Sequence, residues 1–243
     1  MHIFIIIGFL FLLTESSLNA ANTIKERRSK TLFQGAERCF RAGQWGTAAG
    51  WFQEFIENNS NSPLRNKAIL YRAQALFRMK HYRECFNELK NAEESSGLLA
   101  AQYKFWMAEC RYREAEDAQK NEGLYQVAAQ LYAEVPKSDR LVAANISEAM
   151  AYARLKDWPK VVELLQPATS PFQKFVSSSP KSSLSSQGRL ILAEALLRQN
   201  LYADATNILS QLSVLDLADQ DNWRHQMLLS HGLIAQKKNN EAL

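Results

Sequence analysis

The chain has 243 residues, 47% of them hydrophobic, which is enough to bury a sizeable core. Only nine glycines and six prolines occur, so long segments are free of helix breakers and the composition favours helices. The formal net charge is +4, and the basic and acidic residues are interspersed rather than gathered in basic blocks, which argues against a nucleic-acid-binding protein. The three cysteines are widely spaced and predict buried thiols, with a Cys39–Cys85 bridge as the alternative.

The N-terminal residues have the pattern of a secretory signal. An apolar run from Ile3 to Leu13 is too short to span a bilayer and is followed by polar residues and by small residues at Ala20 and Ala21. We therefore expect residues 1–21 to be a cleaved signal peptide and the product to be exported without a stable membrane span. No lysine or arginine precedes the apolar run, which leaves an uncleaved, membrane-tethering segment as the alternative.

Five similar hexapeptides recur along the rest of the chain. They read AERCFR, AQALFR, AECRYR, AMAYAR and AEALLR, and their first alanines are Ala36, Ala73, Ala108, Ala149 and Ala193. The intervals between these alanines, 37, 35, 41 and 44 residues, are typical of stacked supersecondary units.

A second pattern follows each hexapeptide: an aromatic, a small and a large residue at positions i, i+3 and i+7, which is one face of a helix. The aromatic residues are Trp45, Tyr82, Tyr125, Trp158 and Tyr202; the small ones are Ala48, Cys85, Ala128, Val161 and Ala205; the large ones are Phe52, Leu89, Tyr132, Leu165 and Leu209. Polar turns such as AGQW and LKDW separate the two helices, and prolines follow several second helices. Each unit is thus predicted to be a helix pair whose small residues let neighbouring helices approach closely.

This order of small residue, turn, aromatic, small, large and proline resembles the tetratricopeptide repeat (TPR) over residues 31–243. The segment 45–77 is similar to repeats of bacterial cell-envelope proteins, namely the Tol-Pal-associated periplasmic protein and the lipoprotein of the outer-membrane assembly machinery. It matches their FxxFIxxxPxSP pattern except at the earlier proline, and the lipid-bearing cysteine of the lipoprotein is absent. The resemblance implies an all-α, right-handed superhelical solenoid of antiparallel helix pairs, located in the periplasm or cell envelope.

The expected organisation is four TPR-like units over residues 22–168, a flexible Ser/Pro-rich connector over 169–186, and a fifth unit with an incomplete sixth over 187–243. The insertion EAEDAQKNEGL after Arg113 either lengthens a first helix by about two turns or forms a loop. The closing NNEAL is expected to open a second helix of the sixth unit. Because a solenoid needs a capping helix, we expect the sequence to be the N-terminal part of a longer protein.

In the TPR resemblance, the first helices line a concave face that holds a peptide or a partner helix. The residues that end the hexapeptides are therefore the candidate partner-binding residues: Phe40, Arg41, Phe77, Arg78, Tyr112, Arg113, Arg154 and Arg198. Arginines along a groove suit an acidic partner, and aromatic residues suit an amphipathic one. The alternative is architectural, because an arginine in a last helical turn favours the helix dipole and Glu37, Glu109 and Glu194 stand four residues before three of the arginines.

The sequence gives no indication of an enzyme. The four histidines form no metal-ligand pair, and no Gly-rich phosphate loop or G-x-S-x-G elbow occurs, so no catalytic residue, cofactor or metal is expected. The predicted function is an exported TPR scaffold that binds another protein, and not nucleic acid. The alternatives are a self-assembling structural repeat protein and the non-catalytic N-terminal part of a multidomain protein.

Overall fold

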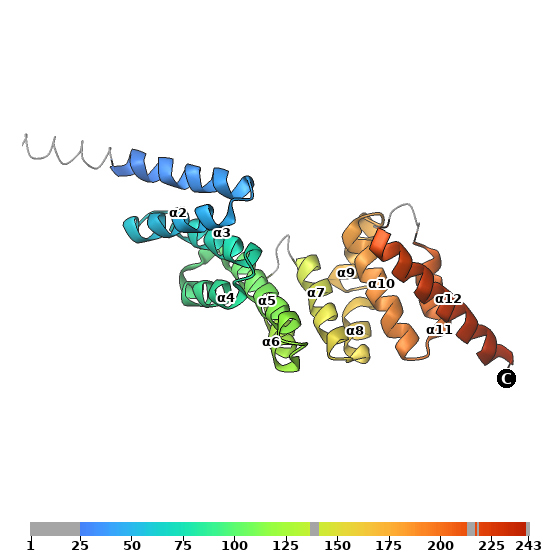
Figure 1. Ribbon diagram of the computed structural model, residues 1–243. Coiled ribbons are helices and arrows are strands. Elements are labelled where there is room, and N and C mark those ends of the chain that lie inside the picture. The colour runs from blue at the N-terminus through green and yellow to red at the C-terminus, as the bar shows by residue number, and fades with distance from the viewer. Residues whose placement is uncertain (1–24, 137–140, 213–216, 218, 242–243) are drawn as a thin grey trace, which may run out of the picture. The chain divides into compact units, whose positions relative to one another are not determined.

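The computed structural model describes residues 25–136, 141–212, 217 and 219–241, and every regular element in these ranges is helical (Figure 1). The predicted signal peptide, residues 1–21, lies outside the described residues. The chain forms two compact units that divide between Ser95 and Ser96.

The first unit contains a helix at residues 25–41 followed by α2 (Trp45–Asn58), α3 (Arg65–Arg78), α4 (Tyr82–Asn91) and the short 3-10 helix η1 (Glu93–Ser95). The second unit contains η2 (Gly97–Leu99), α5 (Ala100–Asp117), α6 (Glu122–Ala133), α7 (Leu141–Arg154), α8 (Trp158–Leu165), α9 (Pro171–Ser178), α10 (Ser183–Arg198), α11 (Tyr202–Ser210) and α12 (Asp219–Glu241). The predicted pairs are 25–41 with α2, α3 with α4, α5 with α6, α7 with α8, and α10 with α11. Within each unit, consecutive helices pack against each other.

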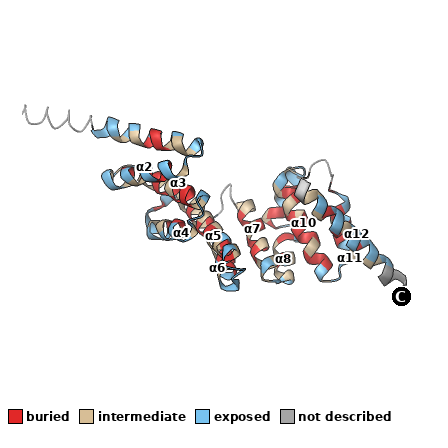
Figure 2. Cartoon of the chain, viewed as in Figure 1, coloured by how far each residue is buried: buried red, intermediate tan, exposed pale blue. Residues whose placement is uncertain are grey.

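The recurring small and large residues form the core of both units. The five hexapeptide alanines, the five small residues and the five large residues of the second helices are all at most 2% exposed. Figure 2 shows buried residues along the helices of both units. The positions that recur in the sequence are therefore the buried ones, because each helix pair covers its apolar faces only by packing on its neighbours.

The turn inside each pair uses one residue in the left-handed conformation. These residues are Gly43, Lys80, Lys120, Lys156 and Asn200, with φ between 60 and 75°. In four of the turns, the amide that follows donates to a carbonyl five residues back, as from Asp157 to Tyr152 (3.0 Å), which closes the first helix in a Schellman motif. In the third turn Gln119 also has a positive φ, so this turn is one residue longer.

The insertion after Arg113 combines the two expected outcomes. Helix α5 continues for one more turn, to Asp117, and the longer turn then leads into α6. Asn121 caps α6, since its side chain accepts a hydrogen bond from the amide of Leu124 (3.1 Å).

The segment 169–186 differs from the flexible connector that its serines and prolines suggest, because it contains α9 and the first turn of α10. The Ser170 side chain accepts from the amide of Gln173 and caps α9, whose first residue is Pro171. Ser182 caps α10 in the same way. Phe172 is fully buried against α10, where a methyl group at Gly188 would overlap its ring.

The end of the chain also differs from expectation. Helix α12 runs without a break from Asp219 to Glu241, so the segment NNE continues this helix instead of opening a second one. The three cysteines are free thiols; Cys85 and Cys110 are buried as predicted, whereas Cys39 is only half-buried.

Candidate functional site

All five arginines that end the hexapeptides are exposed, whereas the residues beside them are not. Tyr112 is buried, and Phe40 and Phe77 are half-buried. Phe40 packs edge-on against Trp45, with ring centroids 5.1 Å apart, and Phe77 packs in the same way on Tyr82 at 5.2 Å. Phe40 and Phe77 thus pack inside their own helix pairs, and Phe40 also stacks on Tyr71 of α3, with ring centroids 5.4 Å apart.

Two arginines lie over the aromatic residue that opens the second helix of the preceding pair. The guanidinium of Arg78 is 5.9 Å from the ring of Trp45, and that of Arg198 is 5.6 Å from the ring of Trp158. Such contacts contribute about 0.5–1 kcal/mol at exposed sites. This stacking adds a contact that the sequence patterns did not indicate to the architectural alternative for these arginines.

The glutamates placed four residues before the arginines turn mainly toward other helices. Glu37 pairs with Lys67 of α3 at 3.1 Å, and Glu194 pairs with Arg224 of α12 at 2.5 Å. Glu194 also reaches Arg198, but at 3.9 Å. An ion pair between neighbouring helices is better shielded from water than one along an exposed helix face, so the pairs between helices are favoured.

A groove runs along the first helices of the second unit and consists of two adjoining hollows. The hollow of about 220 Å³ between α5, α7 and α10 is lined by Phe105, Glu109, Tyr112, Arg113, Tyr132, Ala143, Ser147, Met150, Leu184 and Gln187. The hollow of about 300 Å³ between α7, α10 and α12 is lined by Tyr112, Met150, Ala153, Arg154, Trp158, Ile191, Glu194 and Arg224. Tyr112 and Met150 line both, and we call the two together the first-helix groove.

Polar contacts across the groove hold its helices together. The Tyr132 hydroxyl donates to the Glu109 carboxylate at 2.6 Å, and the Ser147 hydroxyl donates to the same oxygen at 3.4 Å. Burial and the Glu109 carboxylate raise the pKa of Tyr132 well above its usual value, so this phenol stays protonated as a donor.

A second network joins α5 to α7 at the rim of the groove. Glu116 accepts from both Arg113 (2.9 Å) and Arg154 (2.8 Å), and Arg154 also donates to the Tyr112 hydroxyl at 3.1 Å. Burial raises the pKa of Tyr112, with Arg154 acting in the opposite direction. The arginines are the more exposed partners, with 45% and 46% of their side chains accessible against 27% for Glu116.

The structure brings together some of the predicted site residues. Tyr112, Arg113 and Arg154 line the groove, and Arg198 borders it through Glu194. Phe40, Arg41, Phe77 and Arg78 belong to the first unit.

Three groove residues were not predicted from the sequence: Glu109, Met150 and Glu194. All three occupy the second position of their hexapeptides, four residues before the arginine and therefore on the same helix face. That register could have identified them. Arg224 follows no hexapeptide, so the repeat pattern gave no signal for it.

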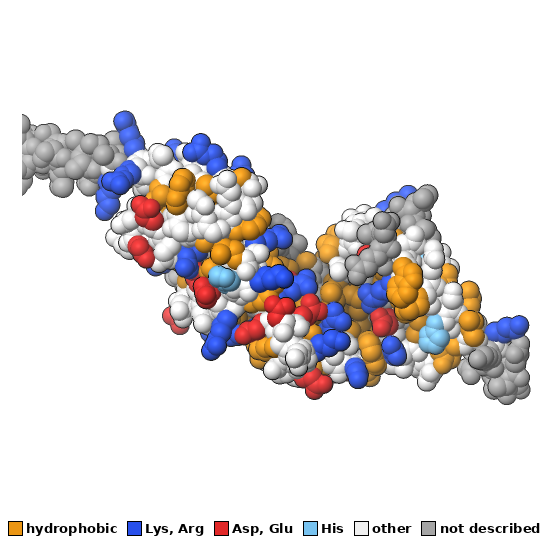
Figure 3. All heavy atoms as spheres, viewed as in Figure 1, with side chains coloured by type: hydrophobic (Ala, Val, Ile, Leu, Met, Phe, Trp, Pro, Cys, Tyr) orange, Lys and Arg blue, Asp and Glu red, His pale blue; other side chains and the backbone are white. Residues whose placement is uncertain are grey.

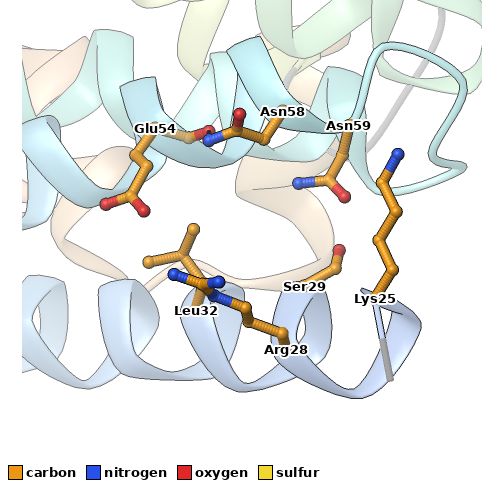
Figure 4. Close-up of a pocket in the computed structure, with 7 residues that line it drawn as sticks. All are labelled: Lys25, Arg28, Ser29, Leu32, Glu54, Asn58 and Asn59. Carbon is orange, nitrogen blue, oxygen red and sulfur yellow. Dashed lines mark hydrogen bonds between the residues drawn. The ribbon is translucent and has the colours of Figure 1, made fainter. Parts of the chain in front are cut away.

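A polar hollow of about 290 Å³ lies in the first unit between the helix at residues 25–41 and α2 (Figure 4). Lys25, Arg28, Ser29 and Leu32 face Glu54, Asn58 and Asn59 across it. The side-chain amides of Asn58 and Asn59 donate to carbonyls of the last turn of α2, each at 2.9 Å. The two asparagines therefore have a structural explanation as caps of this helix end.

In the residues whose placement is described, no three His, Cys, Asp or Glu side chains are grouped so that they could hold a metal ion. Over the same ranges, no helix combines the length and the apolar character needed to cross a membrane.

Comparison with known proteins gives similarity in structure only. No protein-family model matches the chain, and no curated protein matches its sequence. The chain is similar to a kinesin light chain from Podosopora anserina with nearly identical TPR-like repeats. The TM-score is 0.52 and the identity 15%, over 76% of this chain and 92% of that one. A point variant of the same protein gives the same values. A Rap protein complexed with competence and sporulation factor aligns at a TM-score of 0.48 and 17% identity, over 88% of this chain and 65% of that one. The first similarity confirms the predicted all-α, TPR-like fold of stacked helix pairs.

Proposed function

We propose that this chain is a non-catalytic TPR-like scaffold that binds a peptide or helix of another protein in its first-helix groove. The observation that carries the proposal is the continuity of this groove, since the two hollows share Tyr112 and Met150 and together cross four first helices. A surface of this kind suits an extended segment that places successive side chains in successive hollows.

The lining suggests the chemistry of the partner. The larger hollow has apolar residues in its lining, Met150, Ala153, Trp158 and Ile191, beside the charged Arg154, Glu194 and Arg224. The acidic residues at the rim are already paired with arginines, and the arginine of each pair is the more exposed partner. In the pair of Arg224 with Glu194, for example, 34% of the arginine side chain is exposed and 24% of the glutamate side chain. We therefore propose a partner segment with an apolar or aromatic side chain flanked by acidic residues.

A peptide selection tests the proposal. Random peptides displayed on phage are selected on the immobilised chain, and enriched peptides are measured by fluorescence anisotropy. Replacing Ala153 by Phe fills the larger hollow, so we expect affinity to fall by about tenfold or more, which corresponds to roughly 1.4 kcal/mol. Ala133→Phe is the matched control, because Ala133 is exposed on α6, a second helix.

The two variants separate the outcomes. Acidic peptides that bind the wild type and Ala133→Phe equally, but Ala153→Phe weakly, support the proposal. Peptides that bind all three proteins equally, or no enrichment of any peptide, contradict it.

We also propose that the scaffold is exported and acts in the periplasm or cell envelope. The N-terminal sequence pattern and the resemblance of residues 45–77 to envelope repeat proteins support this. N-terminal sequencing of the soluble protein from producing cells is the test. A start near Asn22 is expected, and retention of Met1 on the soluble protein would contradict export with cleavage.

Self-assembly is a second candidate function, favoured by exposed apolar side chains on α12. Trp223, Met227 and Ile234 are 69%, 47% and 57% exposed and lie at i, i+4 and i+11 on one face. The buried residues of this helix, such as His225 and Leu228, lie on its other side. A molar mass that rises with concentration would support self-assembly, and a monomer over a wide range would exclude it.

A further inference from the structure

The net charge of the chain resides on a single helix. The helix at residues 25–41 contains six of the 29 basic residues and two of the 25 acidic ones, which gives it a charge of +4. The other 226 residues hold 23 basic and 23 acidic side chains and are neutral together. The basic and acidic residues are therefore less evenly interspersed than the sequence analysis assumed.

Four of these cations form one row along the helix. Arg27, Lys30, Arg38 and Arg41 are spaced at i, i+3, i+11 and i+14, with Gln34 between them at i+7, so they share one face. At 1.5 Å per residue the row is about 21 Å long. We call these four residues the basic row. Figure 3 shows basic side chains gathered along this helix at the upper edge of the first unit.

The basic row faces away from the core. Phe33 and Ala36 are on the opposite face and are buried with Phe52 and Phe55 of α2. All four cations of the row are exposed, and none has an ion pair within the described part of the chain. The nearby Glu37 instead pairs with Lys67 of α3.

The geometry selects among anionic partners. Within the described residues, the row lies on the exposed face of its helix, opposite the buried Phe33 and Ala36, so it fits a flat surface better than a strand that must lie in a groove. No aromatic residue is among the exposed residues of this helix, so the row itself offers no ring on which nucleic acid bases could stack.

We propose that the basic row binds the surface of a membrane that contains anionic lipids. Because the apolar face of the helix is occupied by the core of the first unit, the row binds through charge and does not insert. Attraction of this kind is screened by salt, with a Debye length of about 10 Å at 0.1 M. The surface is distinct from the first-helix groove, which belongs to the second unit.

Vesicle sedimentation with the full chain tests the proposal. Binding to vesicles of phosphatidylcholine alone is compared with binding to vesicles in which about a third is phosphatidylserine, at low and at high salt. The neutral vesicles report any binding by the apolar N-terminal run. We expect the anionic vesicles to bind about tenfold more tightly at low salt, and this preference to disappear at high salt.

Two variants with equal net charge isolate the row. Arg27→Glu, Lys30→Glu and Arg38→Glu together change the net charge from +4 to −2, and so do Arg83→Glu, Lys174→Glu and Lys181→Glu, which replace exposed cations elsewhere. We expect the first variant to lose the preference for anionic vesicles and the second to keep most of it. Circular dichroism checks the fold, and the corresponding three Gln substitutions replace the first variant if it unfolds.

Three results would overturn the proposal: equal loss in both variants, equal binding of wild type to neutral and anionic vesicles, or tighter binding to duplex DNA than to the vesicles. Equal loss would mean that net charge, not the row, is what matters. Binding to DNA would assign the row to nucleic acid instead.

Discussion

Lys156 has a backbone conformation that most side chains avoid. Its φ of 60° lies in the left-handed region, which costs a residue with a Cβ about 1 kcal/mol or more. Replacing Lys156 by Gly removes this cost and keeps the turn, so we expect the free energy of unfolding to rise by about 0.5–1 kcal/mol in urea denaturation.

The control for this change is Lys174→Gly, an exposed site inside α9. There the same substitution should lower the free energy of unfolding by about 1 kcal/mol. If both variants were destabilised, the left-handed turn would not be the strained position that the backbone indicates.

Glu148 is a nearly buried carboxyl group on α7, only 7% exposed. Burial raises its pKa to about 7; Lys160 opposes this shift and Glu163 adds to it. The folded protein therefore holds a proton that the unfolded chain releases near pH 4.5, and stability is lost as the pH rises from about 4.5 to about 7.

Glu148→Gln removes the ionisation and should stabilise the protein at neutral pH. We expect its advantage in free energy of unfolding over the wild type to be small near pH 4 and to grow to roughly 2–3 kcal/mol near pH 8. Thermal unfolding at several pH values measures it. An advantage that did not change with pH would show that the carboxyl group has an ordinary pKa.

At the scale of elements, α9 shows where reading the composition is misleading. Its serines and prolines are typical of a connector, but Ser170 is an N-cap and Pro171 is the first helical residue. The capping pattern was present in the sequence. What the sequence did not show is that Phe172 packs over Gly188, because this depends on the close approach of two helices.

Gly188 provides a test of this packing. In an exposed helix Gly→Ala stabilises by about 1 kcal/mol, but at Gly188 the new methyl group would displace the buried Phe172 ring. We expect Gly188→Ala to lower the free energy of unfolding by about 1–3 kcal/mol and to expose α9 to proteolysis.

Gly50→Ala is the matched control, because nothing lies within 4 Å of the position its Cβ would take in α2. It should raise the free energy of unfolding by about 0.5–1 kcal/mol. Stabilisation by both substitutions would mean that α9 does not pack on α10 as described.

For the molecule as a whole, the sequence predicted which residues are buried. It predicted the groove only in part. The hexapeptide alanines and the residues spaced at i, i+3 and i+7 repeat because every helix pair packs in the same way, so one sequence shows the pattern five times. The left-handed turns carry a glycine only at Gly43, so the usual sequence signal for such a turn was missing in four units.

The contacts between first helices could not be predicted in the same way. Whether Glu194 pairs with Arg198 on its own helix or with Arg224 on the next depends on the distance between two helices, which no spacing within one helix reveals. The arginines that end the hexapeptides are exposed, but stacking on Trp45 and Trp158 ties Arg78 and Arg198 to the architecture.

The central claim is that a partner segment occupies the first-helix groove of the second unit. The chain has five methionines, of which Met150 lines both hollows, Met107 is fully buried, and Met79 and Met227 are exposed elsewhere. The most direct measurement is a methyl NMR spectrum of the ¹³C-methionine-labelled chain, recorded with and without a selected peptide and assigned with Met150→Leu. We expect the Met150 methyl signal to shift while those of Met79 and Met227 stay in place. A shift at Met227 or Met79 with Met150 unchanged would contradict it.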